Sequence, residues 1–379
     1  MINIIDKSTC SGCTACAVAC PHSAIKMEVD EKGFVYPRVN LDLCVDCSIC
    51  ERVCPFHEQY ERYDNYAEPR YYAMRYLDSE QLLKSQSGGA FYVLSNEILK
   101  RGGVVYGAGF DSAFRVEHQR TDSVEGRDKM RGSKYVQSAL KDIFQIVKTD
   151  IRQGREVLFC GTPCQIAGLR AFFGRRQPES LITVDLLCHG VASPLFWHDY
   201  LDMIEKKERR KLTGVHMRDK SYGWLSSEET YVFGNKRVHK NTFYSLYYSG
   251  YISRESCFNC PFTNDKRVAD LSLGDYHGWN NSHDNFTDNT GMSLVLVNSS
   301  KGQALIDSVK TDTKVYCTEQ TVNPKDHVAL AAVAHKAVRY DAFWADFERK
   351  GAIYVCKKYG DMSFMTQLHI KLAKLLRHE

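Results

Sequence analysis

The sequence has no long hydrophobic run, and none of its segments approaches the roughly 18 apolar residues that a membrane span requires. The N-terminal segment, MINIIDKSTC, lacks the basic and then apolar order of a secretory signal. A strong charge of one sign is also lacking, because 50 basic side chains nearly balance 46 acidic ones and leave a formal charge of +4. We therefore expect a cytoplasmic protein with no transmembrane segment and no nucleic-acid partner.

Cysteine, in contrast, is abundant. Fifteen cysteines would suggest disulfides in a small secreted domain, but eight of them lie within the first 54 residues in two runs of identical spacing, Cys-x2-Cys-x2-Cys-x3-Cys-Pro. This is the spacing of bacterial ferredoxins, in which the fourth cysteine of each run binds the cluster of the other run. We therefore expect two 4Fe-4S clusters, one on Cys10, Cys13, Cys16 and Cys54 and the other on Cys44, Cys47, Cys50 and Cys20.

The segment between the two runs predicts a β-hairpin, because apolar residues alternate at Ile25, Met27 and Val29 and again at Phe34 and Tyr36. Residues 1–58 are thus expected to form an α+β ferredoxin-like domain. Paired Cys-x2-Cys spacing also suits zinc, but two complete runs with trailing prolines favour iron. Residues 59–69 are polar and rich in tyrosine, and we interpret them as a linker that lies along the next domain, with a stacking surface for a ring as the alternative.

Beyond residue 70, short β-branched runs alternate with helical periodicity. This pattern predicts a larger α/β domain with a mostly parallel sheet, divided into an N-terminal part at 70–155 and a C-terminal part at 156–320. Residues 321–379 are predicted to form a helical tail. The tail ends in the basic amphipathic stretch LHIKLAKLLRHE, which we expect to dock on its own domain rather than on a membrane or a partner.

In such sheets ligands gather at the carboxyl ends of the strands, so the loops after strands are the candidate sites. The first is KSQSGGAF, where Ser87, Gly88 and Gly89 precede a helix. Free amides at a helix N-terminus favour a phosphate, although a serine cap followed by glycines is also an ordinary helix start. Arg131 and Lys134 in a later basic loop are further phosphate candidates or else solvated surface residues.

Two further units share one shape, a strand followed by a cysteine-bearing loop and a helix. In EVLFCGTPCQIAGLRAFF the turn holds Gly161, Thr162, Pro163 and Cys164, and Cys160 is interpreted as a buried structural residue at the end of the strand. In SLITVDLLCHGVASPLFW the loop holds Cys188 and His189, and Ser193 and Pro194 begin the helix. A thiolate at a helix N-terminus suits either a nucleophile or a metal ligand.

The segment SCFNCPF adds Cys257 and Cys260, which need partners because two thiolates do not fill a metal site. Cys164 and Cys188 are the natural suppliers, and together the four predict a third 4Fe-4S cluster. A zinc site that uses His189 or His277 and a set of unligated cysteines are the alternatives. Farther along, a strand over 268–275 runs into a turn at Gly274 and Asp275, whose carboxylate faces a cofactor or caps a loop.

Taken together, these loops resemble the coenzyme F420 hydrogenase/dehydrogenase β-subunit family. The resemblance extends over roughly residues 70–320 and rests on SGG at 87–89, GTPCQ at 161–165, CHG at 188–190, CFNCPF at 257–262 and ADLSLGD at 269–275. It implies a bound FAD, an iron–sulfur cluster near the flavin, and a two-electron substrate such as coenzyme F420 or, in plant and cyanobacterial relatives, a tetrapyrrole. The residues it implies around the cofactor are Ser87, Gly88, Gly89, Gly161, Thr162, Pro163, Gly274 and Asp275, to which we add Lys134.

We therefore predict an iron–sulfur flavoprotein oxidoreductase that exchanges electrons with a redox partner such as ferredoxin or another oxidoreductase subunit. A flavin beside clusters converts one-electron transfers into two-electron chemistry. His189 and His277 are candidate proton donors or structural residues. Two alternatives stay open: an electron-transfer subunit without substrate chemistry of its own, and a cysteine-nucleophile enzyme that uses Cys164 and His189.

Overall fold

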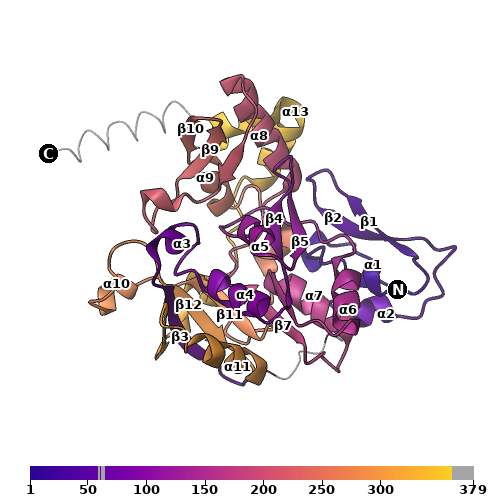
Figure 1. The fold of residues 1–379 in the computed structure, drawn as a ribbon. Helices are drawn as coiled ribbons and strands as arrows, with labels where there is room; N and C mark the ends of the chain where they lie inside the picture. The colour runs from indigo at the N-terminus through magenta and orange to yellow at the C-terminus, as the bar shows by residue number, and fades with distance from the viewer. Residues whose placement is uncertain (59, 61–64, 361–379) are drawn as a thin grey trace.

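An eight-stranded mixed sheet forms the centre of the molecule (Figure 1). The computed structural model describes residues 1–58, 60 and 65–360. The strands lie in the order β13-β3-β12-β11-β7-β6-β4-β5. In sequence order they are β3 (Arg70–Tyr76), β4 (Val104–Phe110), β5 (Val116–Thr121), β6 (Val157–Gly161), β7 (Leu181–Leu186), β11 (Leu271–Asp275), β12 (Ser293–Val297) and β13 (Val315–Gln320).

The predicted strands are present, but the prediction of a mostly parallel sheet is wrong. Only the central strands β11, β7, β6 and β4 pair in parallel, whereas β5 on one side and β12, β3 and β13 on the other pair antiparallel. A fully buried run such as the SLVLV of β12 has the same pattern in either direction. The sequence therefore indicated the strands without indicating the direction in which the outer strands run.

Helices cover both faces of this sheet. On one face α4 (Ala90–Lys100) and α11 (Ser300–Val309) pack against residues such as Val105 and Leu158. On the other face α6 (Ile143–Arg152) and α7 (Pro163–Phe173) pack against residues such as Tyr106 and Phe159. Successive side chains of a strand point to opposite faces, so each strand supplies both cores.

The N-terminal module lies against the helices of this second face, at one end of the molecule (Figure 1). It consists of η1 (Lys7–Thr9), α1 (Ala15–Ala19), the antiparallel hairpin of β1 (Ile25–Val29) and β2 (Val35–Val39), and α2 (Ile49–Arg52). The hairpin has the predicted place. The module approaches α7 so closely that a Cβ added at Gly168 would lie 2.9 Å from the sulfur of Cys13.

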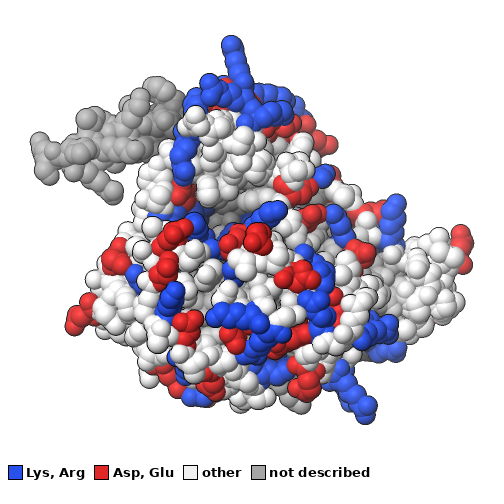
Figure 2. Space-filling view, viewed as in Figure 1, with Lys and Arg blue, Asp and Glu red and all other residues white. Residues whose placement is uncertain are grey.

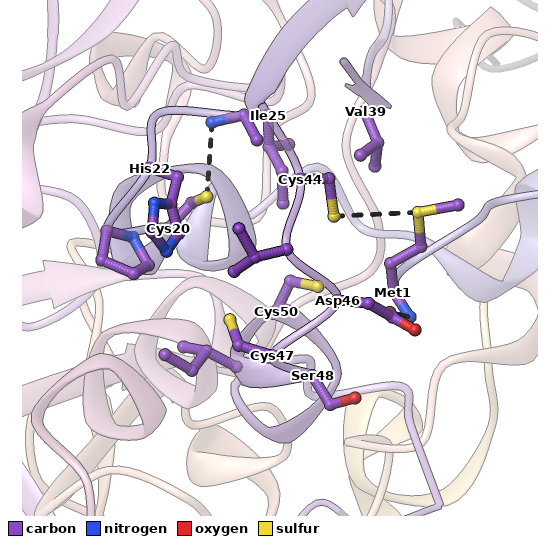
Figure 3. A pocket seen from close by; sticks show the side chains of 14 residues that line it. Met1, Cys20, His22, Ile25, Val39, Cys44, Asp46, Cys47, Ser48 and Cys50 are labelled. Carbon is purple, nitrogen blue, oxygen red and sulfur yellow. Dashed lines mark hydrogen bonds and ion pairs between the residues drawn. The ribbon is translucent and has the colours of Figure 1, made fainter. Parts of the chain in front are cut away.

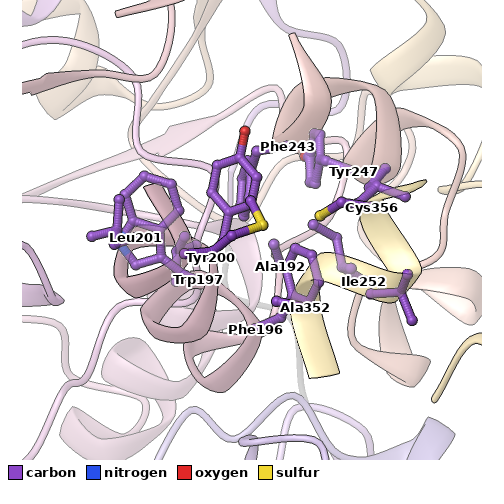
Figure 4. Packing of buried hydrophobic residues seen from close by; sticks show 14 of the residues in the cluster. Ala192, Phe196, Trp197, Tyr200, Leu201, Phe243, Tyr247, Ile252, Ala352 and Cys356 are labelled. Carbon is purple, nitrogen blue, oxygen red and sulfur yellow. The ribbon is translucent and has the colours of Figure 1, made fainter. Parts of the chain in front are cut away.

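A third part of the molecule is built from a small sheet and three helices (Figure 1). The sheet order is β10-β9-β8, with β8 (Gly214–His216), β9 (Glu229–Phe233) and β10 (Lys236–Lys240); the helices are α8 (Pro194–Glu208), α9 (Thr242–Tyr248) and α13 (Tyr340–Tyr359). Phe196, Trp197 and Tyr200 of α8 pack against Phe243 of α9 (Figure 4). Ser193 caps α8 as predicted, because its hydroxyl accepts a hydrogen bond from Phe196 N.

Short elements complete the described chain. These are α3 (Ser79–Leu83), α5 (Val124–Lys129), η2 (Lys220–Tyr222), η3 (Glu255–Asn259), α10 (Trp279–Ser282), η4 (Pro324–Asp326) and α12 (Val328–Ala331). Part of the predicted linker lies along the large domain, because the Asn65 amide donates to the carbonyls of Arg267 and Ala269. The rest of that linker, residues 59 and 61–64, and the predicted amphipathic stretch at 368–379 lie outside the described residues.

Basic and acidic side chains are interspersed over most of the face shown in Figure 2. Over residues 1–58, 60 and 65–360, no helix has the length and apolar composition needed to cross a bilayer.

Candidate functional site

A cleft with a volume of about 440 Å³ opens at the carboxyl ends of the central strands. It is lined by the ends of β4, β6, β7 and β11 on one side and by residues of α9 on the other. Parallel strands place their carboxyl ends at one edge of a sheet, which is why loops from distant parts of the sequence meet there. The volume falls in the range of pockets that bind cofactors and small molecules.

Most of the predicted cofactor residues line this cleft: Ser87, Gly89, Lys134, Gly161, Thr162, Gly274 and Asp275. Gly88 and Pro163 do not. Gly88 packs between two strands, where an added Cβ would lie 2.1 Å from the carbonyl oxygen of Met74. Pro163 is buried in the first turn of α7.

The Ser87–Gly89 loop differs from the predicted serine cap. The N-cap of α4 is Gly89, with a φ of 83° that favours glycine, and its helix starts at Ala90. The Ser87 hydroxyl instead donates to the carbonyl of Met292, and the amide of Gly88 donates to the hydroxyl of Ser293. The loop is therefore held by β12, and Ser87 is not free to cap the helix.

Lys134 lies at the cleft wall and not on a solvated surface. Its ammonium group donates hydrogen bonds to the carbonyls of Met130 and Arg131, at 2.7 and 2.8 Å, just after α5. Burial lowers the pKa of Lys134 to about 7. Arg131 also lines the cleft, but its guanidinium binds the side chains of Gln81 and Ser85. Lys134 thus loses its positive charge close to neutral pH. Arg131 instead binds α3 and the residues that follow it.

Asp275 meets a partner that the sequence did not suggest. Arg218 binds one oxygen of its carboxylate at 2.5 Å, and the indole nitrogen of Trp224 donates to the other at 2.8 Å. Burial raises the pKa of Asp275, but the charge of Arg218 more than offsets this effect and lowers it overall. Asp275 is thus an ionised group held in a fixed position. A carboxylate that only caps a loop in solvent would not be held in this way.

The two candidate proton donors lie at the cleft in different surroundings. His189 is partly buried beside Tyr248, with ring centres 5.8 Å apart, and burial together with His277 lowers its pKa. The side chain of His277 is 54% exposed and stacks on Trp224. Both line the cleft, and His277 Nε2 lies 3.9 Å from a carboxylate oxygen of Asp275, which is longer than a hydrogen bond.

Sequence reasoning missed the buried His118 and the tyrosines of α9. His118 Nε2 lies 3.1 Å from the carbonyl oxygen of Cys160, and Nδ1 lies 2.9 Å from the hydroxyl of Ser138. Burial lowers the pKa of His118 to about 4, so the ring is neutral. The cleft wall also contains Tyr135, Tyr244, Tyr247 and Tyr248. Helical spacing in the sequence already brings Tyr244, Tyr247 and Tyr248 together on α9, whereas only the tertiary fold adds Tyr135 and His118 to the cleft wall.

Cys164, Cys188, Cys257 and Cys260 gather beneath this cleft. Burial raises the pKa of the Cys188 thiol, and the nearby thiols of Cys257 and Cys164 raise it further. Gly190 N donates to the sulfur of Cys188 at 3.3 Å, and the hydroxyl of Thr162 lies 3.2 Å from the sulfur of Cys164. Four clustered thiols with amide and hydroxyl donors suit an iron–sulfur cluster.

Cysteines of the N-terminal module form two further groups. In the inner group, burial raises the pKa of Cys13, and the thiols of Cys16, Cys54 and Cys10 raise it further. Cys54, which belongs to the second run, thus lies with three cysteines of the first run. The outer group consists of Cys20, Cys44, Cys47 and Cys50 around one small pocket (Figure 3). The structure therefore places the fourth cysteine of each run beside the other run, as the crossed arrangement requires.

The geometry of these groups differs from that of a single-ion site. Among the described residues, no three His, Cys, Asp or Glu side chains are arranged to hold one metal ion. A 4Fe-4S cluster is larger than an ion, and its four thiolates bind four separate irons. Backbone amides donate to the sulfurs of Cys10 and Cys20, from Gly12 N at 3.4 Å and Ala24 N at 3.3 Å. All fifteen cysteines are free of disulfides.

Two cysteine groups in a separate module and a third beneath a cleft define an iron–sulfur electron-transfer protein. Comparison with known families supports this class. Residues 9–57 match the 4Fe-4S dicluster domain, and residues 154–323 match the C terminus of the coenzyme F420 hydrogenase/dehydrogenase beta subunit. The chain thus contains a region similar to the C terminus of that beta subunit behind an N-terminal region similar to the 4Fe-4S dicluster domain, which confirms the resemblance noted in the sequence.

The comparisons with individual proteins add less. A chain of the F420-reducing [NiFe] hydrogenase complex from Methanosarcina barkeri is 18% identical, with a TM-score of 0.47 over 68% of this chain and 85% of that chain. A search of curated proteins found no significant match.

Proposed function

We propose that this protein is a flavin-dependent iron–sulfur oxidoreductase that binds FAD in the cleft and exchanges two electrons with a small molecule there. The observation that carries the proposal is the position of the Cys164, Cys188, Cys257 and Cys260 group. It lies directly beneath the cleft, since Cys188, His189 and Gly190 line the cleft while Gly190 also lies against Cys257.

The three cysteine groups follow one another from the surface to the cleft. Cys47 of the outer group is exposed, whereas Cys10, Cys13 and Cys16 of the inner group are buried between the module and the large domain. Ser11, next to Cys10, lies beside Cys164, whose pKa is raised by burial and by Cys260 and lowered by the hydroxyls of Thr162 and Ser11. We propose that these groups hold three 4Fe-4S clusters, with the ligands predicted from the sequence.

The cleft residues suit an FAD. Lys134 offers a cation for a phosphate, and Tyr135 with the three tyrosines of α9 offers flat surfaces for a ring. The Arg218–Asp275 pair fixes charge at the end of β11. A bound flavin would supply the conversion between one-electron and two-electron transfer. The residues themselves would orient the cofactor and exclude water from it.

The substrate side of the cleft is the place for a compound such as coenzyme F420. His189 and His277 lie there as candidate proton donors. A redox partner would exchange electrons at the outer cysteine group, because that group is the one near the surface. Cysteines that bind clusters must not be oxidised to disulfides, which requires a reducing compartment. We therefore propose a cytoplasmic location.

The two alternative functions, a cysteine-nucleophile enzyme and an electron-transfer subunit, differ from this proposal in what they require. The first requires Cys164 to act as a nucleophile. As a nucleophile it would need a nearby base, yet its neighbours are the thiol of Cys260 and two hydroxyls. This environment favours ligation. An electron-transfer subunit without substrate chemistry would have the same clusters but would transfer no electrons to a small molecule in the absence of a partner.

The decisive experiment is the analysis of anaerobically purified protein. We expect about twelve irons and twelve sulfides per chain and one FAD, from three four-iron clusters and one flavin site. Eight irons without flavin would contradict the proposal. Turnover with reduced ferredoxin and a small-molecule acceptor, without any partner subunit, would then separate the oxidoreductase from the electron-transfer subunit.

A further inference from the structure

Arg254 occupies the space between the N-terminal module and the third cysteine group. Its side chain is completely buried. It is the residue before η3, and the Cys257 amide donates a hydrogen bond to its carbonyl. Cys257 and Cys260 of the third group therefore belong to the same short segment of the chain as the guanidinium.

The guanidinium holds the inner group of the module in place. Its Nε donates to the carbonyl of Cys10 at 2.8 Å, and one terminal nitrogen donates to the carbonyl of Val35 at 2.9 Å and lies 3.8 Å from the sulfur of Cys10. The other terminal nitrogen donates to the side-chain oxygen of Gln137 at 3.0 Å, and the Gln137 amide donates to the carbonyl of Ser11. The central carbon of the guanidinium, Cζ, also lies 4.2 Å from the ring centre of Tyr36.

No carboxylate of the described chain forms an ion pair with this buried cation. Its neighbours are carbonyl oxygens, an amide oxygen, aromatic rings and thiols. A buried charge without a paired counter-charge is strongly unfavourable, so the environment of Arg254 favours a negative group in contact with the guanidinium.

Two cysteine groups can supply that charge. The sulfur of Cys10 is in contact with the guanidinium, and the charge of Arg254 acts on the thiols of Cys164 and Cys257. A 4Fe-4S cluster on four thiolates is an anion, and it becomes more negative when it accepts an electron. A fixed cation nearby therefore favours the reduced form.

We propose that Arg254 is a positioning residue that compensates the negative charge of the inner cluster and of the third cluster and raises the reduction potentials of both. The part that concerns the third cluster rests on the proposed function. The part that concerns the inner cluster depends only on the dicluster domain. Arg254 thereby keeps the reduction potentials of the inner and third clusters close to each other. Electrons can then cross between the N-terminal module and the large domain.

The test is a redox titration of the clusters in the full-length protein, followed by electron paramagnetic resonance. Arg254→Met should make reduction of the inner cluster at least tenfold less favourable. For a one-electron step this corresponds to a reduction potential that is lower by about 59 mV. Arg254→Lys keeps the charge and should restore most of that potential. The matched control is Arg127→Met, since Arg127 is also fully buried and lies over a tyrosine ring, that of Tyr92, yet has no cysteine beside it.

Gln137→Glu tests the same idea while the arginine is kept. The new carboxylate would lie on the guanidinium and neutralise its charge, so it should lower the potential in the same direction as Arg254→Met. This variant decides the matter if Arg254→Met fails to fold. Unchanged potentials in Gln137→Glu protein that retains its full iron content would overturn the proposal. Equal losses in Arg254→Lys and Arg254→Met would also overturn it, because packing and not charge would then be responsible.

The outcomes separate this inference from the proposed function. A protein with eight irons and no flavin would contradict the proposed function, yet the inner cluster should still respond to Arg254. Twelve irons and one FAD with potentials insensitive to Arg254 and Gln137 would support the function and contradict the inference.

Discussion

Arg218 and Asp275 form an ion pair at the end of β11 in which both side chains are largely buried, with 10% and 15% of their surfaces exposed. The two residues come from different parts of the fold, because Arg218 follows β8 of the small sheet and Asp275 ends a strand of the large sheet. The pair therefore joins the two walls of the cleft, and Trp224 reinforces it.

Asp275→Ala should destabilise the protein by about 3 kcal/mol, because it leaves the Arg218 cation buried without its counter-charge. Anaerobic urea unfolding measures this loss. Glu80→Ala is the matched control: Glu80 pairs with Lys84 on the surface of α3, where such a pair contributes about 0.5 kcal/mol or less. Similar losses in the two variants would show that the buried pair does not join the walls.

Cys164→Ser should remove about four of twelve irons and leave the eight of the N-terminal module in place. Iron and sulfide analysis checks this, together with the absorbance of the clusters. Cys317→Ser is the control, since Cys317 is partly buried on β13 without another cysteine beside it. A Cys164→Ser protein with unchanged iron that has lost all activity would instead support the nucleophile.

Cys20→Ser and Cys47→Ser should disturb the same cluster, although they lie in different runs. Both side chains line the outer pocket (Figure 3), whereas Cys54 lies with the inner group. We expect the two variants to lose one and the same electron paramagnetic resonance signal and Cys54→Ser to lose the other. If Cys20→Ser matched Cys54→Ser, the ligands would not cross over between the runs.

Lowering the pH should destabilise the fold through His118. Because the pKa of His118 is about 4 in the folded protein and near 6.5 in an unfolded chain, only the unfolded state binds a proton between these values. Stability is therefore retained above pH 6.5 and falls as the pH decreases toward 4, by up to about 1.4 kcal/mol per unit. His118→Gln should flatten this dependence in unfolding experiments.

The control for that experiment is His198→Gln, because the His198 side chain is 57% exposed on α8. This variant should retain the dependence of the wild-type protein between pH 6.5 and 4. A slope that persists in His118→Gln would assign the acid sensitivity to other groups.

FAD binding should weaken as the pH rises through 7. Burial lowers the pKa of Lys134 to about 7, so the ammonium form that attracts a phosphate predominates only below that value. Lys134→Met should bind FAD about tenfold more weakly at pH 6 and should lose the pH dependence, as expected for a lost charge-assisted hydrogen bond. Flavin fluorescence titrations measure both effects.

Lys129→Met is the matched control for the FAD titrations, because Lys129 lies at the exposed end of α5 near the same loop. It should bind FAD as the wild-type protein does. Equal affinities in the Lys134→Met and wild-type proteins at pH 6 would remove Lys134 from the cofactor site.

Much of the site could be predicted from local patterns. The cysteine runs, the strand-loop-helix units and the GTPCQ and CHG loops are short segments whose spacing reflects local backbone geometry. The cap of α8 at Ser193 followed from the same local rules. The Ser87 cap prediction failed because Ser87 and Gly88 bind β12, which lies more than two hundred residues away in the sequence.

The sequence by itself determined that the protein holds iron–sulfur clusters and has an α/β core, because cysteine spacing and hydrophobic periodicity are local properties. The tertiary structure alone decided the antiparallel outer strands, the Arg218–Asp275 pair, the neutral His118 and the position of Arg254 between two cysteine groups. Each of these depends on contacts between distant segments. The charge of a buried group is set by whichever segments surround it, and no single stretch of the sequence contains that information.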